Sequence, residues 1–270
     1  MILRKFLITV ATLALATTAV QAGDLKLMDP TGDDNGPGGY LYPTDAAYTP
    51  GSFDLAEVEI EEKGRDIEFS VSVNQRLDDP WGMDTGFAVQ MVFIFIDTDG
   101  RQGSGHTAGL PGLNVQFAPA DAWDKVVILS PQPAARVQAE IASKAADMAN
   151  DIVVPRRTTG RGKTISAKVK AEEIGDGDPA GWGYQVVMQS NEGFPAKTDL
   201  LTRRVNEFEG QHRFGGGNDM MCDPHVMDAL AGNADGSDDE IQLQHDMLGS
   251  YTCSMDGSED ELATLTMVRR

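Results

Sequence analysis

The segment that most constrains the fold is the apolar run from Phe87 to Ile96. Side chains alternate between the two faces of a strand, and here both alternating rows are apolar near the end of the run. Phe93 and Phe95 lie on one row, and the other row holds Val92, Ile94 and Ile96. This pattern predicts a central strand that is covered on both faces.

The apolar run leads directly into an acidic, glycine-rich turn between Asp97 and Gly105. Asp97 and Asp99 continue one row of the strand, so we expect their carboxylates to converge just past its end. The spacing is not that of an EF-hand, because Arg101 takes the fifth position and Ala108 the twelfth. Two interpretations stay open, a calcium-binding loop and an Asp-Gly turn that ends the strand.

Residues 1–22 have the composition of a secretory signal peptide. Two basic residues precede an apolar run, and small residues stand before Gly23. We therefore expect a periplasmic or secreted protein without a transmembrane span. Residues 23–270 are long enough for one β-rich domain, with residues 215–270 as a C-terminal appendage.

The chain is strongly acidic, with 42 Asp and Glu against 22 Lys and Arg and a net charge of −20. Nucleic acids and anionic lipids require a positive surface, so neither is an expected partner. Many of the acidic residues cluster among Gly, Pro and Ser, which is typical of solvated loops and sometimes of metal loops. Solubility and divalent cation binding both explain the charge.

The loop that opens the predicted domain carries Asp29, Asp33, Asp34 and Asn35 among four glycines and two prolines. This composition excludes a helix or a regular strand. Carboxylates and carbonyls on a stiff loop suit a hard cation, so the sequence predicts either a calcium site or a plain loop built on Asx turns. A calcium ion held by Asp97 and Asp99 would also fix this loop if the loop folded beside them.

Cys222 and Cys253 are the only two cysteines, and in an exported protein such a pair predicts a disulfide. Neither the haem-attachment spacing nor a structural zinc spacing is present.

Periodicity predicts several strands in addition to the central one. Residues 53–61 and 66–73 alternate apolar and polar side chains around a turn at Glu62-Lys63-Gly64, as half-exposed antiparallel strands do. Further strands are predicted at 113–117, 125–130, 136–143, 164–170, 182–190 and 262–268. Residues 134–150 also fit a helical face, and we prefer a strand followed by a helical turn.

The region after Leu201 gives weaker signals. A hairpin is predicted from 203–208 and 211–214, a short helix after Pro224, and an acidic loop at 234–239.

The sequence also contains a series of ordered motifs: Asp29 to Gly38, Gly51 to Leu55, Pro80-Trp81-Gly82, Asp97 to Gly100, Leu110 to Asn114, Ala118 to Asp124, Gly181 to Tyr184, Phe214 to Gly217 and Asp223 to Asp228. In this order they resemble the C-terminal binding module of glucodextranase, a member of the DOMON-like β-sandwich group. The resemblance implies an all-β, immunoglobulin-like or DOMON-like antiparallel β-sandwich, with a disulfide-linked C-terminal segment that contains short helices.

The same resemblance implies a non-catalytic protein that binds carbohydrate or a cell-surface polysaccharide, and it leaves room for an exported protein partner. Sugars stack on flat aromatic rings, and the candidate ligand contacts are Trp81, Trp123, Trp182, Tyr40 and Tyr184. No nucleophile elbow, phosphate loop or zinc-protease motif occurs, so we expect no enzyme.

A haem-binding electron-transfer subunit is the alternative, because some DOMON-like relatives bind b-type haem. Haem is the less expected ligand, since a methionine on an apolar strand usually packs in the core. The available axial donors are Met91, Met188, His106, His212, His225 and His245.

Overall fold

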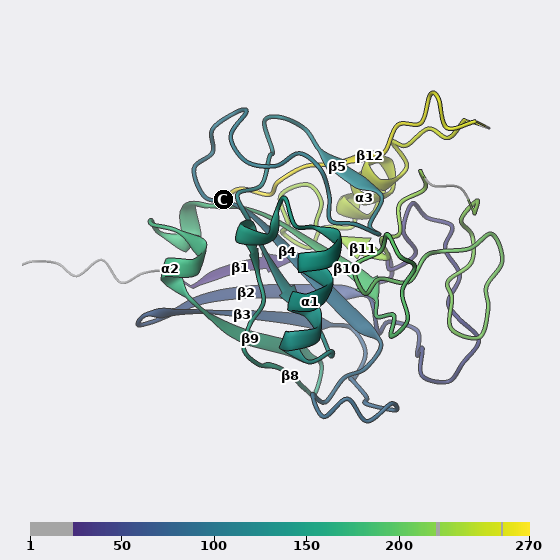
Figure 1. Cartoon of the computed structure of the whole chain (residues 1–270), viewed down its shortest axis with the longest axis horizontal. Coiled ribbons are helices and arrows are strands. Elements are labelled where there is room, and N and C mark those ends of the chain that lie inside the picture. The colour runs from purple at the N-terminus through teal and green to yellow at the C-terminus, as the bar shows by residue number, and fades with distance from the viewer. Residues whose placement is uncertain (1–23, 220–221, 255) are drawn as a thin grey trace, which may run out of the picture.

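The computed structural model describes residues 24–219, 222–254 and 256–270, so the predicted signal peptide lies outside the described residues. Two five-stranded sheets pack face to face (Figure 1). The first has the order β1 (Leu25–Met28), β2 (Leu55–Lys63), β3 (Asp66–Val73), β9 (Thr164–Lys170) and β8 (Thr158–Arg161). Its neighbouring strands are all antiparallel, and the alternation in β2 and β3 places one face inward and the other toward solvent.

The second sheet lies in the interior of the molecule. Its order is β11 (Asp228–Ala229), β10 (Gly183–Ser190), β4 (Gln90–Asp97), β6 (Lys125–Leu129) and β7 (Ile152–Val153). Only the pair of β6 with β7 is parallel. A separate parallel pair joins β5 (Val115–Phe117) to β12 (Ala263–Leu265). The predicted all-β antiparallel sandwich is therefore confirmed.

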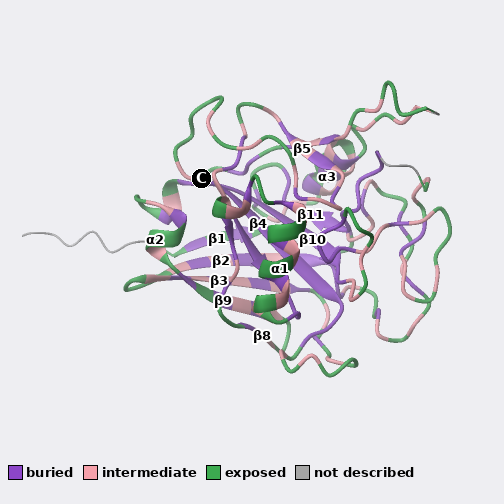
Figure 2. Cartoon of the chain, viewed as in Figure 1, coloured by how far each residue is buried: buried purple, intermediate pink, exposed green. Residues whose placement is uncertain are grey.

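β4 is the predicted central strand, and every one of its residues is buried (Figure 2). Val92, Ile94 and Ile96 belong to the apolar core between the two sheets. Phe93 and Phe95 point to the opposite face, where they join a second core covered by α1 (Ala134–Lys144) and by the β5 and β12 region. The two apolar rows of one strand thus serve two separate cores.

The predicted strand at 136–143 is wrong, because this segment is the helix α1. Val137 and Ile141 are one helical turn apart and are both buried, whereas Ala139, which a strand would place beside them, is exposed. The helical and the strand pattern both fit this segment, and the packing of Val137 and Ile141 in the second core favours the helix. Short helical segments occur at α2 (Ala171–Ile174), η1 (Ala149–Asp151) and η2 (Pro179–Gly181).

The C-terminal part of the chain also differs from the sequence prediction. No helix follows Pro224, since residues 222–231 are buried throughout and run extended to add β11 to the edge of β10. The helix lies later, at α3 (Asp239–Leu248). Residues 203–214 form turns and loops, without the two strands of the predicted hairpin.

The predicted disulfide is present between Cys222 and Cys253, whose Cα atoms are 5.6 Å apart. It links the buried segment before β11 to the tail that follows α3. Among the described residues, no helix has the length and the apolar character needed to cross a bilayer.

Candidate metal centre

Three aspartates from distant parts of the chain meet at one point in the structure. Asp29, Asp33 and Asp228 each offer a carboxylate oxygen, and these oxygens lie within 4.8 Å of one another. Their side chains are buried, with exposed fractions of 5%, 1% and 0%. Buried carboxylates are rare unless they are paired or coordinate a metal, so this cluster requires an explanation.

Both sheets position these aspartates. Asp29 follows β1 directly, and its N–H donates to the carbonyl of Ala56 on β2 at 3.1 Å. Asp228 lies on β11 in the other sheet, and its Oδ2 accepts from the N–H of Leu55 at 2.7 Å. The cluster therefore joins the edges of the two sheets.

Four oxygens of this cluster have no hydrogen-bond partner. They are one oxygen of Asp29, both oxygens of Asp33 and one oxygen of Asp228. Buried polar atoms in native proteins nearly always have a partner, and an unpartnered charged group carries a large desolvation penalty. These unpartnered oxygens are grouped so that they could hold a metal ion.

The electrostatics agree with this interpretation. Burial, reinforced by repulsion from neighbouring carboxylates, raises the pKa of Asp33 to about 7. Burial likewise raises the pKa of Asp29 and Asp228 well above the usual range, and repulsion from Asp33 adds to both. Charged carboxylates in this arrangement need a cation to offset their mutual repulsion.

Two further carboxylates lie near the cluster, but backbone groups satisfy both of them. Both oxygens of Asp54 accept from the N–H of Gly32 at 3.0 Å. Glu240 at the start of α3 is buried and accepts backbone hydrogen bonds from Asn233 and Gly236, each at 2.9 Å. These two residues shape the surroundings and leave the three aspartates as the candidate ligand set.

Asp33 lies in the loop between β1 and β2, and a side chain of α3 holds this loop in place. Gln244 is buried, and its amide donates to the carbonyl of Asp33 at 2.7 Å. The same side chain accepts from the N–H of Ala229 on β11 at 2.8 Å. Gly36 has φ +62°, and the ring of Tyr40 occupies the space where a Cβ would lie, so the turn requires glycine.

Two other residues of the predicted calcium loop have different partners. Asp34 accepts a hydrogen bond from the hydroxyl of Tyr42. Asn35 lies 3.0 Å from Nε2 of His245 through its Oδ1 atom. The structure thus includes Asp29 and Asp33 of the predicted set in the cluster and adds Asp228, which the sequence did not indicate.

A second acidic cluster lies at the predicted end of the central strand, where Asp97, Asp99 and Asp124 approach one another. Its oxygens already have partners. Asp97 accepts from the N–H of Gly100 at 2.8 Å and pairs with Arg269 at 2.5 Å, while Asp124 accepts from the N–H of Thr98 at 2.8 Å. This geometry is that of a hydrogen-bonded turn closed by an ion pair, and the calcium site predicted for Asp97 and Asp99 stays a prediction.

One ion cannot join the two acidic clusters. Asp228 pairs with Met188, which lies opposite Val92, and Asp97 is five residues further along β4. At about 3.4 Å per residue the clusters are separated by about 17 Å along the strand. The expectation that one ion also ties down the Asp29 to Asn35 loop is wrong.

Four of the five aromatic residues predicted to contact sugar are in the core. Tyr40, Trp123, Trp182 and Tyr184 are all less than 5% exposed. Trp123 packs on Phe95, and its indole N–H donates to the carbonyl of Ala108 at 2.9 Å. A buried ring has no free face for a ligand, so these four residues are not surface contacts. Trp182 packs in the core between the sheets, and Trp123 packs in the second core.

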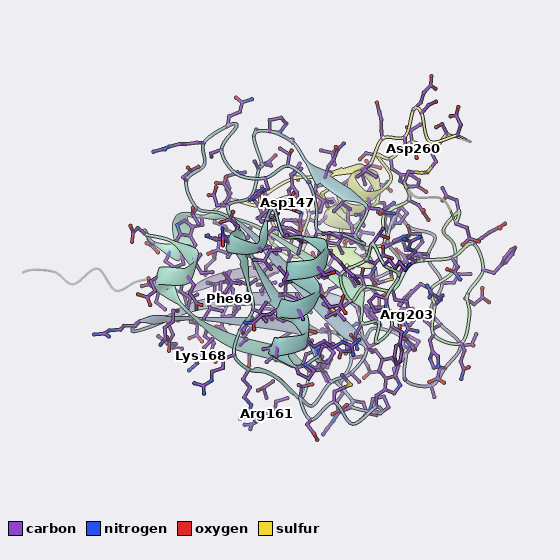
Figure 3. All side chains as sticks on the ribbon, in the orientation of Figure 1. Phe69, Asp147, Arg161, Lys168, Arg203 and Asp260 are labelled. Atoms are coloured by element: carbon purple, nitrogen blue, oxygen red, sulfur yellow. A yellow bond between two sulfur atoms is a disulfide. The ribbon has the colours of Figure 1, made fainter. Side chains whose placement is uncertain are left out.

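Trp81 is the exception, with an exposed fraction of 36%. Its ring lies 6.1 Å from that of Tyr48 and 6.1 Å from that of His212. The guanidinium carbon of Arg203, a residue labelled in Figure 3, is 5.9 Å from the centre of the Trp81 ring. Glu192 lies 3.4 Å from Arg203. This set places two charged side chains, which are only 10% and 12% exposed, beside a partly exposed aromatic ring.

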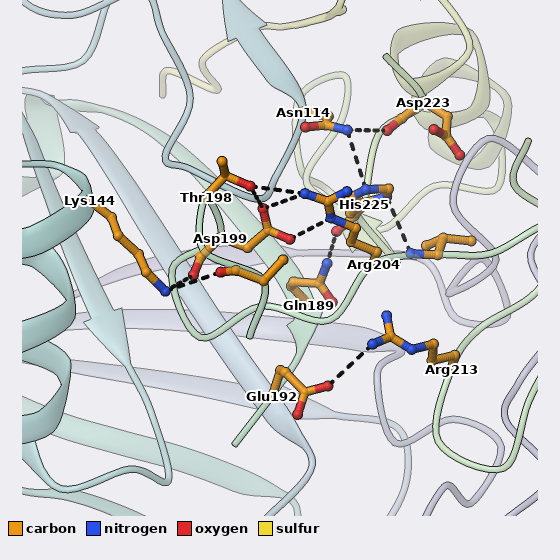
Figure 4. A network of polar contacts seen from close by, with 12 residues as sticks. Asn114, Lys144, Gln189, Glu192, Thr198, Asp199, Arg204, Arg213, Asp223 and His225 are labelled. Atoms are coloured by element: carbon orange, nitrogen blue, oxygen red, sulfur yellow. Dashed lines mark hydrogen bonds and ion pairs between the residues drawn. The ribbon is translucent and has the colours of Figure 1, made fainter. Parts of the chain in front are cut away.

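A buried polar network ties the loop after β10 to the rest of the molecule (Figure 4). Arg204 binds the carboxylate of Asp199 at 2.6 Å, and Lys144 at the end of α1 donates to the Asp199 carbonyl at 2.7 Å. His225 lies in the same network, 3.3 Å from the amide nitrogen of Asn114 and 3.3 Å from the N–H of Val205. The network fixes the 196–205 loop.

The possible haem ligands do not converge in the structure. Met188 packs between the sheets, and Met91 packs in the other core. His106 pairs with Asp151 at 2.9 Å, and His245 contacts Asn35.

The buried His225 predicts a defined pH dependence of stability. Burial, with a smaller contribution from Arg204, lowers the pKa of His225 to about 4, whereas an unfolded histidine titrates near about 6.5. The unfolded state therefore binds more protons between these values, and stability is lost as the pH falls through that window. We expect His225 to destabilise the fold by about 2–3 kcal/mol at pH 4.5 relative to pH 7.5.

The measurement is urea unfolding at both pH values for the wild type and for His225→Asn, whose side-chain oxygen can still accept from the Val205 N–H. The other titrating groups are common to both proteins, so the difference between their pH dependences isolates His225. Equal pH dependence in the two proteins would contradict the assignment.

Comparison with known proteins completes the description of the site. None of the curated proteins is similar enough to the chain to count as a relative. A family model does match, and it spans nearly all of the described residues. The chain belongs to the family described as the C-terminal binding module, SLH-like, of glucodextranase, whose model matches residues 25–268.

Proposed function

We propose that this chain is an exported, non-catalytic carbohydrate-binding module whose fold is stabilised by a calcium ion at Asp29, Asp33 and Asp228. The four unpartnered carboxylate oxygens carry the calcium part of the proposal. The family is a binding module and not a catalytic domain, which supports the binding role. The disulfide supports an oxidising compartment outside the cytoplasm.

Calcium fits this donor set better than magnesium does. Calcium takes six to eight oxygen ligands and accepts both oxygens of one carboxylate, whereas magnesium keeps several waters in a strict octahedron. Asp33 offers both of its oxygens at a buried position. When bound, the ion supplies two positive charges, which offset the repulsion that the buried aspartates impose on one another.

The carbohydrate part rests on the family and on the exposed ring of Trp81. An aromatic face binds the C–H side of a sugar, and nearby charged groups bind the hydroxyls. Trp81 has Arg203 beside its ring, and Glu192 lies next to Arg203. We assign the sugar-stacking role to Trp81, the exposed member of the predicted set.

Affinity electrophoresis in dextran, a glucan of the kind to which the family name points, tests this assignment. We expect Trp81→Ala to weaken retention at least about fivefold, as truncation of a central aromatic contact does. Leu243→Ala is the matched control, because Leu243 is 45% exposed on α3 and lies outside the proposed site. Equal retention of Trp81→Ala and wild type would reject the stacking role.

A further inference from the structure

In one stretch of this acidic protein all charged residues are basic. Residues 152–171 contain no Asp or Glu and six basic residues, Arg156, Arg157, Arg161, Lys163, Lys168 and Lys170. These residues belong to β8, β9 and their flanking loops, at one edge of the first sheet. We call this surface the basic face. It concentrates positive charge in a chain with 42 acidic residues.

All six basic side chains of this face are exposed. Lys168 lies 3.5 Å from Glu68, and Lys170 lies 2.5 Å from Asp66 on the neighbouring strand β3. Within the described part of the chain, the side chains of Arg156, Arg157 and Arg161 form neither an ion pair nor a hydrogen bond. Arg161 and Lys168 project outward from the same side of the sheet (Figure 3).

The basic face contains a hollow of about 570 Å³. Small and hydroxyl side chains line it, among them Thr159 and Ser166, which are paired across β8 and β9. Glu68 also lines it and lies 3.5 Å from Lys168. Arg156, Arg157 and Lys168 also line it. Two unpaired guanidinium groups beside hydroxyl groups provide partners for both the carboxylates and the hydroxyls of a ligand.

A second, smaller hollow of about 140 Å³ shares Arg156 and Arg157 with the first. Asp84 and Thr85 line its wall, and they come from the loop that also carries Trp81. The arginines therefore connect the hollow on the sheet to the loop of the proposed sugar-stacking residue. A chain-like ligand fits this arrangement better than a compact one.

The charge changes in steps across the exposed face of the sheet. β2 presents Glu57, Glu59 and Glu61, and these pair in register with Ser72, Ser70 and Glu68 on β3. Ser70 and Ser166 are in turn paired between β3 and β9. The exposed face thus carries carboxylates on β2, serines together with Glu68 on β3, and hydroxyl and basic side chains on β9 and β8.

We propose that the basic face binds a carboxylate-bearing glycan, lying across β9 and β8 with its carboxylates at Arg156 and Arg157. The proposal rests on the carbohydrate-binding function proposed above and adds the ligand class and a second binding surface. Guanidinium groups bind carboxylates through two parallel hydrogen bonds, and the hydroxyl side chains suit sugar rings.

Charge density favours a glycan over other polyanions. Nucleic acid carries one charge for every phosphate and binds strongly to surfaces with many cations and stacking aromatics, whereas no aromatic residue lines either hollow. The net charge of −20 repels such a dense polyanion. A glycan with a carboxylate on every second sugar has a lower charge density and is repelled less.

Calorimetric titration with hyaluronan oligosaccharides, which carry one carboxylate per two sugars, tests the proposal in the presence of calcium. We expect the Arg156→Gln/Arg157→Gln variant to bind hyaluronan roughly tenfold more weakly, because two charge-assisted contacts are lost. Its binding to neutral dextran should stay at the wild-type level. The matched control is Arg101→Gln/Lys197→Gln, which removes two exposed charges elsewhere and should keep wild-type affinity for hyaluronan.

The outcomes separate this inference from the function on which it rests. If neither dextran nor hyaluronan binds, the carbohydrate function fails and the inference fails with it. If dextran binds but hyaluronan does not, or if the arginine variant binds hyaluronan as wild type does, the inference alone fails. Equal affinity for inorganic polyphosphate and hyaluronan would also overturn it, since the face would then recognise only charge.

Discussion

Removing calcium is expected to lower the unfolding midpoint of this protein by about 8–16 °C. A ligand that binds only the folded state at a thousand times its Kd adds about 4 kcal/mol, and a domain of this size shifts by about 2–4 °C per kcal/mol. Differential scanning calorimetry in excess calcium and in excess EGTA measures the effect. The physical source is the return of the repulsion between Asp29, Asp33 and Asp228 when the ion leaves.

Asp228→Asn and Asp99→Asn form a matched pair for this experiment. The first replaces a buried oxygen of the proposed site, yet keeps an acceptor for the N–H of Leu55. It should abolish most of the response to calcium without making the metal-free protein less stable, because it also removes a buried charge. The second alters the other acidic cluster, where hydrogen bonds already satisfy the carboxylates. A calcium response lost in Asp99→Asn and kept in Asp228→Asn would reverse the assignment.

Loss of the disulfide is expected to have an effect of nearly the same size. The bond between Cys222 and Cys253 closes a loop with a sequence separation of 31 residues. The chain-entropy model then gives about 3.5–4 kcal/mol of stabilisation, equivalent to about 7–16 °C in the midpoint for a domain of this size. Thermal unfolding of Cys222→Ser/Cys253→Ser in saturating calcium measures it.

The same variant distinguishes global from local effects of the disulfide. Cys222 is completely buried beside β11, whereas the segment around Cys253 is largely exposed. If the bond stabilises the whole fold, limited proteolysis should accelerate throughout the chain. Cleavage confined to the 249–262 tail, with an unchanged unfolding midpoint, would show that the bond restrains only that tail.

The strands that bury one or both faces could be predicted well from the sequence. β3 and β9 were predicted with their observed bounds, and β4 was predicted as the central strand with both faces covered. In these segments the pattern of polar and apolar residues indicates which face of each strand is buried, because the side chains alternate between the two faces of the sheet. Burial alone is enough to specify such a strand.

The helix α3 could not be predicted from apolar periodicity. Its buried face carries Glu240, Gln244 and Leu248, spaced one turn apart. Two of these three side chains are polar, so the apolar periodicity that marks a buried helix is missing. Their hydrogen bonds to residues of the 233–236 loop, to Asp33 and to Ala229 compensate for burial, but those partners lie on other segments. A pattern within one segment cannot show them.

About half of the candidate metal centre could be predicted from the sequence. The Asp29 to Asn35 loop has the composition of a cation site, and two of its carboxylates do belong to the cluster. Asp228 could not be assigned, because its place depends on the pairing of β11 with β10 rather than on its neighbours in sequence. The signal that the sequence did hold was the motif Asp223 to Asp228, which was recognised as part of the family pattern and not as a ligand.

The separation of the proposed ligands along the chain decides whether calcium would act on the folding rate or on the unfolding rate. Asp33 and Asp228 are 195 positions apart in the sequence, and the first lies in the loop between β1 and β2 whereas the second lies on β11 of the other sheet. Contacts of such long range form late, after much of the closure entropy has been lost. A bound ion would then stabilise the native state but not the transition state. Calcium would leave the refolding rate nearly unchanged and would act by slowing unfolding, so that its role is kinetic protection of the finished fold.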